Sequence, residues 1–167
     1  MNVLRQGLAL ETMLGFVAVA ARAPIEERPA RVAEALGRFV GDPTLLAGRD
    51  LPCCPQNYVR HLLATGDGYG VAALAWRPGQ MSPVHAHRTW CAFAVQQGTL
   101  TEHFFEMGEP PVLKAAVVRR PGDASHGAAG LEAIHRLANC SALPALSIHV
   151  YGVPYERFGE QVNLILG

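Results

Sequence analysis

Apolar residues recur at two different periods along the chain, and the change of period separates a helical part from a β-rich part. One set with intervals of three and four residues comprises Leu10, Met13, Leu14 and Val17. A second set lies between Pro29 and the breaker Gly41-Asp42-Pro43, and comprises Val32, Leu36, Phe39 and Val40. This spacing is typical of amphipathic helices. We expect two helices that pack together, with apolar faces in the core rather than on a membrane or a partner.

From residue 57 onward, short β-type runs are separated by Gly, Pro and Asp. Seven runs have the composition of strands: 69–76, 81–87, 90–97, 99–107, 112–120, 131–139 and 145–151. Turn signals such as Pro121-Gly122-Asp123 lie between them. Strands that follow one another without intervening helices are typical of a sandwich or a barrel. We expect one domain over residues 1–167, with a helical segment at 1–45 and a β-barrel at 57–155.

Composition restricts the class of protein. The chain has 167 residues, half of them apolar, and a formal charge of zero, which argues against disorder and against nucleic-acid binding. The apolar run 13–20 is much shorter than the ~20 residues that cross a bilayer, so no membrane span is expected. The spacing of the four cysteines matches neither a disulfide framework nor a zinc site: Cys53, Cys54, Cys91 and Cys140. These features favour a cytoplasmic monomer or small homo-oligomer whose partner is a small molecule.

Residues 79–98 carry a candidate metal site. His85 and His87 lie one residue apart in a β-type run, so both imidazoles point to one face, about 6–7 Å apart along the strand. His135, in a later β-type run, is available as a third ligand. Three neutral imidazoles leave positions for substrate and dioxygen, and suit iron, zinc, copper or nickel. The alternative is two exposed histidines on the polar face of a strand.

The frame around these histidines is G-x5-H-x-H-x3-C-x6-G, and the later run contains H-x3-N at His135 and Asn139. Both resemble the two motifs of the cupin superfamily. The resemblance implies a mainly β fold, a double-stranded β-helix with a jelly-roll-like barrel, preceded here by helices. Cys91 stands where many cupins have a glutamate ligand. A cupin isomerase, or a dioxygenase acting on carbon, would need another carboxylate ligand, and no acidic residue occupies the motif position.

The run Ser147-Ile148-His149-Val150-Tyr151 also alternates, which places Ser147, His149 and Tyr151 on one face. If this face is inside the barrel, its polar groups must bond to one another or to a ligand, because an unpaired buried group costs roughly 1–3 kcal/mol. Ser147 would then fix His149, and His149 would hold the Tyr151 phenol toward the metal. The alternative is a strand whose polar face meets water. The histidine ligands favour the interior.

Together with Tyr58-Val59-Arg60 and Trp76, these residues resemble the thiol dioxygenases, cysteine dioxygenase in particular, from about Tyr58 to Pro154. The resemblance implies a barrel that binds non-haem Fe(II) through three histidines and converts a small thiol with O2 into its sulfinic acid. By position it assigns the metal to His85, His87 and His135, and the phenol beside the metal to Tyr151, with Ser147 and His149 behind it. Arg60 takes the position that grips the substrate carboxylate, with Tyr58 and Trp76 beside it. A solvated surface position is the alternative for Arg60.

Cys91 matches the cysteine that forms a thioether link to the tyrosine at the position of Tyr151 in the animal enzymes. The alternative is a buried, inert thiol. Other features are mixed, because Ala86 stands where aspartate is usual, and Trp90 and residues 147–152 resemble the bacterial group that includes 3-mercaptopropionate dioxygenases. That group typically has glutamine at the position of Arg60.

We therefore expect L-cysteine as the substrate and cysteine sulfinic acid as the product, with 3-mercaptopropionate or mercaptosuccinate as alternative substrates. A non-catalytic cupin that binds a metal as a sensor would keep the same barrel and ligands. Arg60 and the row 147–151 favour the enzyme. The three other histidines are expected to be ordinary polar residues, with His126 the nearest to the barrel mouth: His61, His103 and His126.

Overall fold

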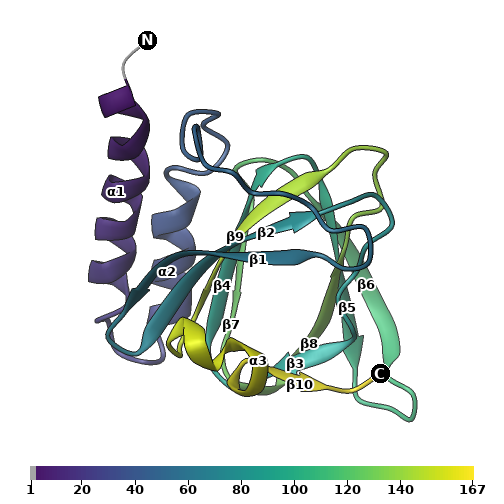
Figure 1. The fold of residues 1–167 in the computed structure, drawn as a ribbon. Helices are drawn as coiled ribbons and strands as arrows, with labels where there is room; N and C mark the ends of the chain where they lie inside the picture. The colour runs from purple at the N-terminus through teal and green to yellow at the C-terminus, as the bar shows by residue number, and fades with distance from the viewer. Residues whose placement is uncertain (1–2) are drawn as a thin grey trace.

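Two antiparallel sheets form a barrel, and two helices cover the outside of one sheet in the computed structural model, which describes residues 3–167 (Figure 1). The elements are α1 (Val3–Ala20), α2 (Arg28–Gly37), β1 (Val59–Gly66), β2 (Tyr69–Trp76), β3 (His85–His87), β4 (Cys91–Gln97), β5 (Leu100–Glu106), β6 (Val112–Arg119), β7 (Ala124–Gly127), β8 (Gly130–Ala138), β9 (Ala145–Tyr151), the 3-10 helix η1 (Tyr155–Arg157), α3 (Phe158–Gln161) and β10 (Asn163–Ile165). The sheet orders are β1-β2-β9-β4-β7 and β10-β3-β8-β5-β6. The predicted mainly β architecture behind N-terminal helices is confirmed.

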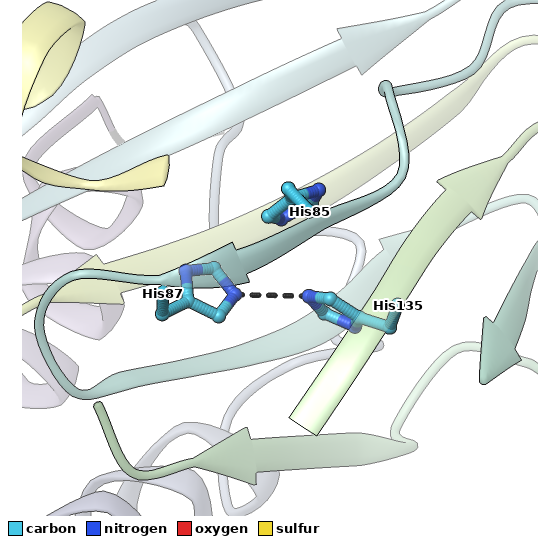
Figure 2. A group of neighbouring side chains, drawn as sticks. All are labelled: His85, His87 and His135. Carbon is cyan, nitrogen blue, oxygen red and sulfur yellow. Dashed lines mark hydrogen bonds between the residues drawn. The ribbon is translucent and has the colours of Figure 1, made fainter. Parts of the chain in front are cut away.

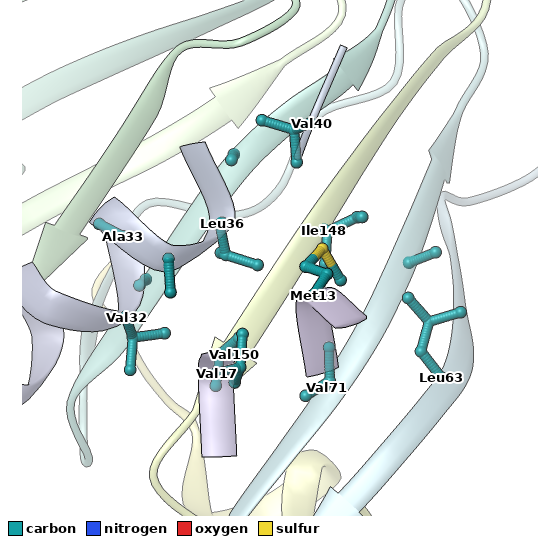
Figure 3. Packing of buried hydrophobic residues seen from close by; sticks show 14 of the residues in the cluster. Met13, Val17, Val32, Ala33, Leu36, Val40, Leu63, Val71, Ile148 and Val150 are labelled. Carbon is teal, nitrogen blue, oxygen red and sulfur yellow. The ribbon is translucent and has the colours of Figure 1, made fainter. Parts of the chain in front are cut away.

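The helices pack against the outer face of the first sheet (Figure 3). Met13 and Val17 of α1 are fully buried, and they share one apolar cluster with Leu36 of α2 and with Ile148 and Val150 of β9. Because side chains alternate along a strand, β9 sends these two residues to the helices and its other residues into the barrel. Both faces of this sheet are therefore covered, and the predicted core role of the helices is confirmed.

The second helix ends earlier than the apolar pattern predicts. It ends at Gly37, and the amides of Phe39 and Val40 both donate to the carbonyl oxygen of Leu36 at 3.0 Å in a tight turn. Glycine is a poor helix former, and Gly41 has a φ of 91° that other residues rarely adopt. Val40 nevertheless belongs to the same apolar cluster as Leu36.

The observed strands follow most of the predicted runs. Residues 69–76 and 145–151 have the predicted limits, and four more runs differ by one residue at one or both ends. The run 81–87 is mostly not a strand, since only His85–His87 is, with a single bridge from Met81 to Ala138. Pro83 interrupts it, because proline has no backbone N–H to donate.

Strands β1, β7 and β10 were not predicted. β1 has a bulge between Leu62 and Ala64 and lies at a sheet edge, whereas β7 and β10 have only four and three residues. Short or bulged strands carry too few alternating positions for a pattern to identify them. Among the described residues, no helix combines the length and the apolar composition needed to cross a bilayer.

Candidate metal centre

Three histidines from two strands converge inside the barrel (Figure 2). β3 supplies His85 and His87, and the antiparallel pairing of β3 with β8 places His135 directly opposite His85. All three are at least 93% buried. One ring nitrogen from each lies within 4.8 Å of the others, and the Nε2 atoms of His87 and His135 are 2.9 Å apart. The structure thus brings the three predicted ligands into one cluster.

The donor set fits a transition metal. Nδ1 of His85 lies 2.9 Å from the Pro83 carbonyl oxygen, and Nδ1 of His135 lies 2.9 Å from Glu102 Oε1. Both oxygens accept, so each ring carries a hydrogen on Nδ1, and the neutral form of each ring directs an Nε2 lone pair inward. Burial, reinforced by His135, lowers the pKa of His85 to about 4 and that of His87 to about 2. Converging neutral nitrogens of this kind are suited to a shared divalent cation.

Glu102 contacts the histidine cluster and was not identified by the sequence interpretation. Glu102 lies on β5 and is almost fully buried, and Arg119 of β6 donates to it through two nitrogens at 2.7 and 2.9 Å. Burial raises the pKa of Glu102, but the hydrogen bond from His135 and the Arg119 guanidinium outweigh burial and leave the pKa below its usual value. The sequence contained a signal for this position. Glu102 is two residues from Leu100 on the same strand, so both side chains point to the same face, and Leu100 is fully buried.

The row on β9 faces the barrel interior, as predicted, and its side chains form a hydrogen-bonded chain. Trp76 Nε1 donates to Ser147 Oγ at 2.9 Å, and Ser147 Oγ lies 2.8 Å from His149 Nε2. His149 Nδ1 lies 3.0 Å from the Tyr151 hydroxyl. Burial, followed by the charge of Arg60, lowers the pKa of His149 well below its usual value, so the ring is neutral.

The direction of this chain depends on the tautomer of His149. Trp76 can only donate, so Ser147 Oγ accepts from it, and when His149 carries its hydrogen on Nδ1 the Ser147 hydroxyl donates onward to His149 Nε2. The neutral ring then donates from Nδ1 to the Tyr151 oxygen, which leaves the phenol O–H free to donate into the pocket. Burial raises the pKa of Tyr151, so the phenol keeps this proton. Its ring centroid is 5.9 Å from that of His87.

Cys91 lies directly opposite Tyr151 where β4 pairs with β9. Both side chains are 5% exposed, and residues opposite each other in a ladder have Cβ atoms about 4.5–5.5 Å apart. Burial raises the pKa of the Cys91 thiol to about 12, so it is protonated at neutral pH. The thiol and the phenol predicted to react are therefore neighbours on adjacent strands.

The three residues predicted to bind substrate line the same small pocket as the histidines. Tyr58 stacks on Trp76 with ring centroids 4.3 Å apart, and Arg60 Nη2 lies 3.4 Å from the Tyr58 hydroxyl. The Nε of Arg60 is buried, and within residues 7–167 neither a hydrogen bond to this atom nor an ion pair of this guanidinium is found. An unpaired guanidinium thus borders the pocket.

A further pocket residue comes from β10, which the sequence interpretation did not identify. Asn163 lies opposite His87 in the ladder, on the same face, and lines the pocket. Its Oδ1 is buried and accepts no hydrogen bond from the described residues.

The three remaining histidines are not part of the triad. His61 lies 3.0 Å from the Pro52 carbonyl oxygen, and His103 is on β5. The exposed His126 borders a second pocket, which Glu102 and Cys91 also line.

The chain is similar to one known protein family and to solved structures. A protein-family model described as cysteine dioxygenase type I matches residues 52–160. A solved structure from Thermus thermophilus is 23% identical, with a TM-score of 0.52, and the match covers 63% of this chain and 95% of that chain. An uncharacterized conserved protein with a double-stranded beta-helix domain from Klebsiella pneumoniae is 15% identical, with a TM-score of 0.54, and the match covers 72% and 97%. These two structures show the fold, a double-stranded β-helix of the cupin type, as predicted.

Proposed function

Because this chain belongs to the cysteine dioxygenase type I family, we propose that it is an Fe(II)-dependent thiol dioxygenase whose substrate is L-cysteine. The reaction joins both atoms of O2 to the substrate sulfur, so that the thiol and O2 become cysteine sulfinic acid without loss of any atom. The substrate is a small thiol, and four free cysteines agree with a reducing cytoplasm as the place of action.

The observation that carries the substrate assignment is the unpaired guanidinium of Arg60 beside the triad. A partly buried cation needs an anionic partner, and the planar fork of arginine suits a carboxylate. Arg60, His85 and His135 line one small pocket, so a thiol with a carboxylate a few bonds away spans the distance between them. Cysteamine has the thiol and the amine but would leave Arg60 unpaired.

The iron would be held by His85, His87 and His135. In such a site, the iron would provide one place where the thiol sulfur and O2 both bind. Holding two reactants side by side makes their reaction effectively intramolecular. The Tyr151 O–H, held by His149, is the hydrogen-bond donor for the reacting groups. Tyr58 and Trp76 form a stacked apolar wall that positions the carbon chain of the substrate and excludes water.

Asn163 supports cysteine over the alternative substrates. Asn163 lines the pocket opposite His87, its buried Oδ1 is an acceptor without a hydrogen bond from the described residues, and the amine of cysteine is a donor. Neither 3-mercaptopropionate nor mercaptosuccinate has an amine. Both have carboxylates, so binding to Arg60 does not make cysteine the preferred substrate. A hydrogen bond from the cysteine amine to Asn163 would.

We also propose the thioether link between Cys91 and Tyr151. A bond forms between the Cys91 sulfur and the ring carbon next to the phenol oxygen, two hydrogens leave, and O2 takes up the two electrons. The direct pairing of these residues across β4 and β9 supports this step.

The test is anaerobic reconstitution with Fe(II), followed by oxygen-uptake and sulfinate measurements with four thiols: cysteine, cysteamine, 3-mercaptopropionate and mercaptosuccinate. We expect one O2 consumed per sulfinate formed, and the highest efficiency with cysteine. Asn163→Leu should lower the efficiency with cysteine by about three- to tenfold, the size of one neutral hydrogen bond, and leave 3-mercaptopropionate unchanged as the matched control. Iron-loaded protein that consumes no O2 with any of the four thiols would instead favour a non-catalytic metal-binding cupin.

A further inference from the structure

The carboxylate of Glu102 contacts His135, one of the three candidate metal ligands. All three candidate ligands are histidines, so none of them supplies a negative charge. We propose that Glu102 is a positioning residue for the metal, which holds His135 in the tautomer that directs Nε2 to the metal and supplies negative charge next to three neutral ligands. This proposal rests on the metal-binding part of the proposed function and is independent of which thiol is oxidised.

The two oxygens of Glu102 have separate partners. Oε2 accepts from Nε and Nη2 of Arg119 at 2.9 and 2.7 Å. Oε1 lies 2.9 Å from His135 Nδ1 and accepts from the Ser125 hydroxyl at 3.3 Å. An ionised carboxylate offers about four lone pairs, and four donors occupy them. Glu102 therefore acts on the metal through His135 and is not a ligand itself.

The contact with His135 follows from the sheet. Glu102 of β5 pairs with Leu137 of β8, so His135 is its diagonal neighbour on the same face of the ladder. Since a carboxylate only accepts, Nδ1 of the neutral ring must carry the hydrogen, and the Nε2 lone pair then points to the Nε2 of His87, 2.9 Å away. Without Glu102, the ring is free to carry its hydrogen on Nε2, where the hydrogen would occupy the metal position.

The partners of Glu102 hold the carboxylate in place from both sheets. Arg119 comes from β6 in the same sheet, and Ser125 comes from β7 in the other sheet. The Arg119 side chain is 20% exposed, against 2% for Glu102, so water screens the cation more than the anion. Partners of this kind beyond the ligands typically change metal affinity by about 10–100-fold.

A purely structural role is the competing explanation, in which Glu102 and Arg119 only join β5 to β6. Loss of either partner from a buried ion pair destabilises a protein whatever its function. A test must therefore read the metal centre directly. It must also include a variant that leaves no charge of this pair unpaired.

The experiment compares Glu102→Ala, the double variant Glu102→Gln/Arg119→Gln, and Glu106→Gln as the matched control. Glu106 is on the same strand and pairs with Lys114 at 3.0 Å, but it is exposed. Circular dichroism and thermal unfolding of the metal-free proteins establish folding. Nitrogen NMR of histidine-labelled, metal-free protein reads the His135 tautomer, and anaerobic competition with a chelator measures the affinity for Fe(II).

We expect a single Nδ1–H tautomer at His135 in the native protein and in Glu106→Gln, with equal Fe(II) affinity. Glu102→Ala should bind Fe(II) about 10–100-fold more weakly and show both tautomers. The double variant should keep the Nδ1–H tautomer through its amide oxygen, yet bind Fe(II) more weakly than the native protein because the charge is absent. If Glu102→Ala does not fold, the double variant decides. Native Fe(II) affinity in a folded variant without the carboxylate would overturn the proposal. Since thiol oxidation is not measured, an incorrect substrate assignment leaves this result unaffected.

Discussion

Replacing Arg60 by glutamine should separate thiols that carry a carboxylate from those that do not. The guanidinium has a buried Nε without a partner and a single long contact, 3.4 Å to the Tyr58 hydroxyl. A substrate carboxylate would therefore supply its main charged hydrogen bonds. Arg60 is partly buried, so the ordinary range for a charged hydrogen bond applies, about 1.5–3 kcal/mol. At about 1.4 kcal/mol per tenfold, kcat/KM for cysteine should fall by about 10–150-fold.

The assay is oxygen uptake by iron-reconstituted Arg60→Gln and native protein, with cysteine and cysteamine as paired substrates. Cysteamine has no carboxylate, so its kcat/KM should change much less than that of cysteine. Arg38→Gln is the control for loss of a positive charge, because Arg38 directly follows α2, is exposed and does not line the pocket. Equal loss with both substrates, or equal efficiency of the native protein on cysteine and cysteamine, would assign the carboxylate to another residue.

Three further outcomes are expected. Alanine at His85, His87 or His135 should abolish iron retention and activity, checked by metal analysis after desalting, and full activity in any one variant would remove that residue from the site. After many aerobic turnovers, intact mass should decrease by two hydrogens and a fragment should join the Cys91 and Tyr151 peptides; separate peptides alone would make Cys91 a packing residue, and Cys91→Ala is the control. In the metal-free protein, the pKa of His85 is lowered from 6.5 to about 4 and that of His87 to about 2. The unfolded chain thus binds more protons below about pH 6.5, and the free energy of unfolding should fall as pH decreases from 6.5 toward 4; equal urea midpoints at pH 7.5 and 5 would contradict this.

The parts of the site that the sequence predicts are those encoded within single strands. His85 and His87 share a face because they are two residues apart, and the same alternation places Ser147, His149 and Tyr151 in a row. The helices were predicted for a similar reason, since the interval from Met13 to Val17 fits one helical face. Local periodicity determines which way these side chains point before any tertiary contact is known.

The residues that were missed depend on which strands become neighbours. Glu102 acts on His135 only because β5 lies beside β8, and Asn163 faces the pocket only because β10 lies beside β3. Single-strand periodicity contains no information about such pairings. The strand over 81–87 was overestimated for the opposite reason: its composition favours a strand, but Pro83 removes the backbone donor that a longer ladder would need.

The strand order also determines when the metal can be captured. Each wall of the pocket pairs strands that are distant in the chain: β2 lies beside β9, where Gly70 meets Tyr151, and β3 lies beside β10, where His87 meets Asn163. A growing chain that ends before His135 offers only two of the three ligands, and such long-range pairings fold slowly. If the proposed iron site is correct, metal loading would follow synthesis of the whole barrel, and refolding in vitro should receive Fe(II) after the strands have paired rather than at the start.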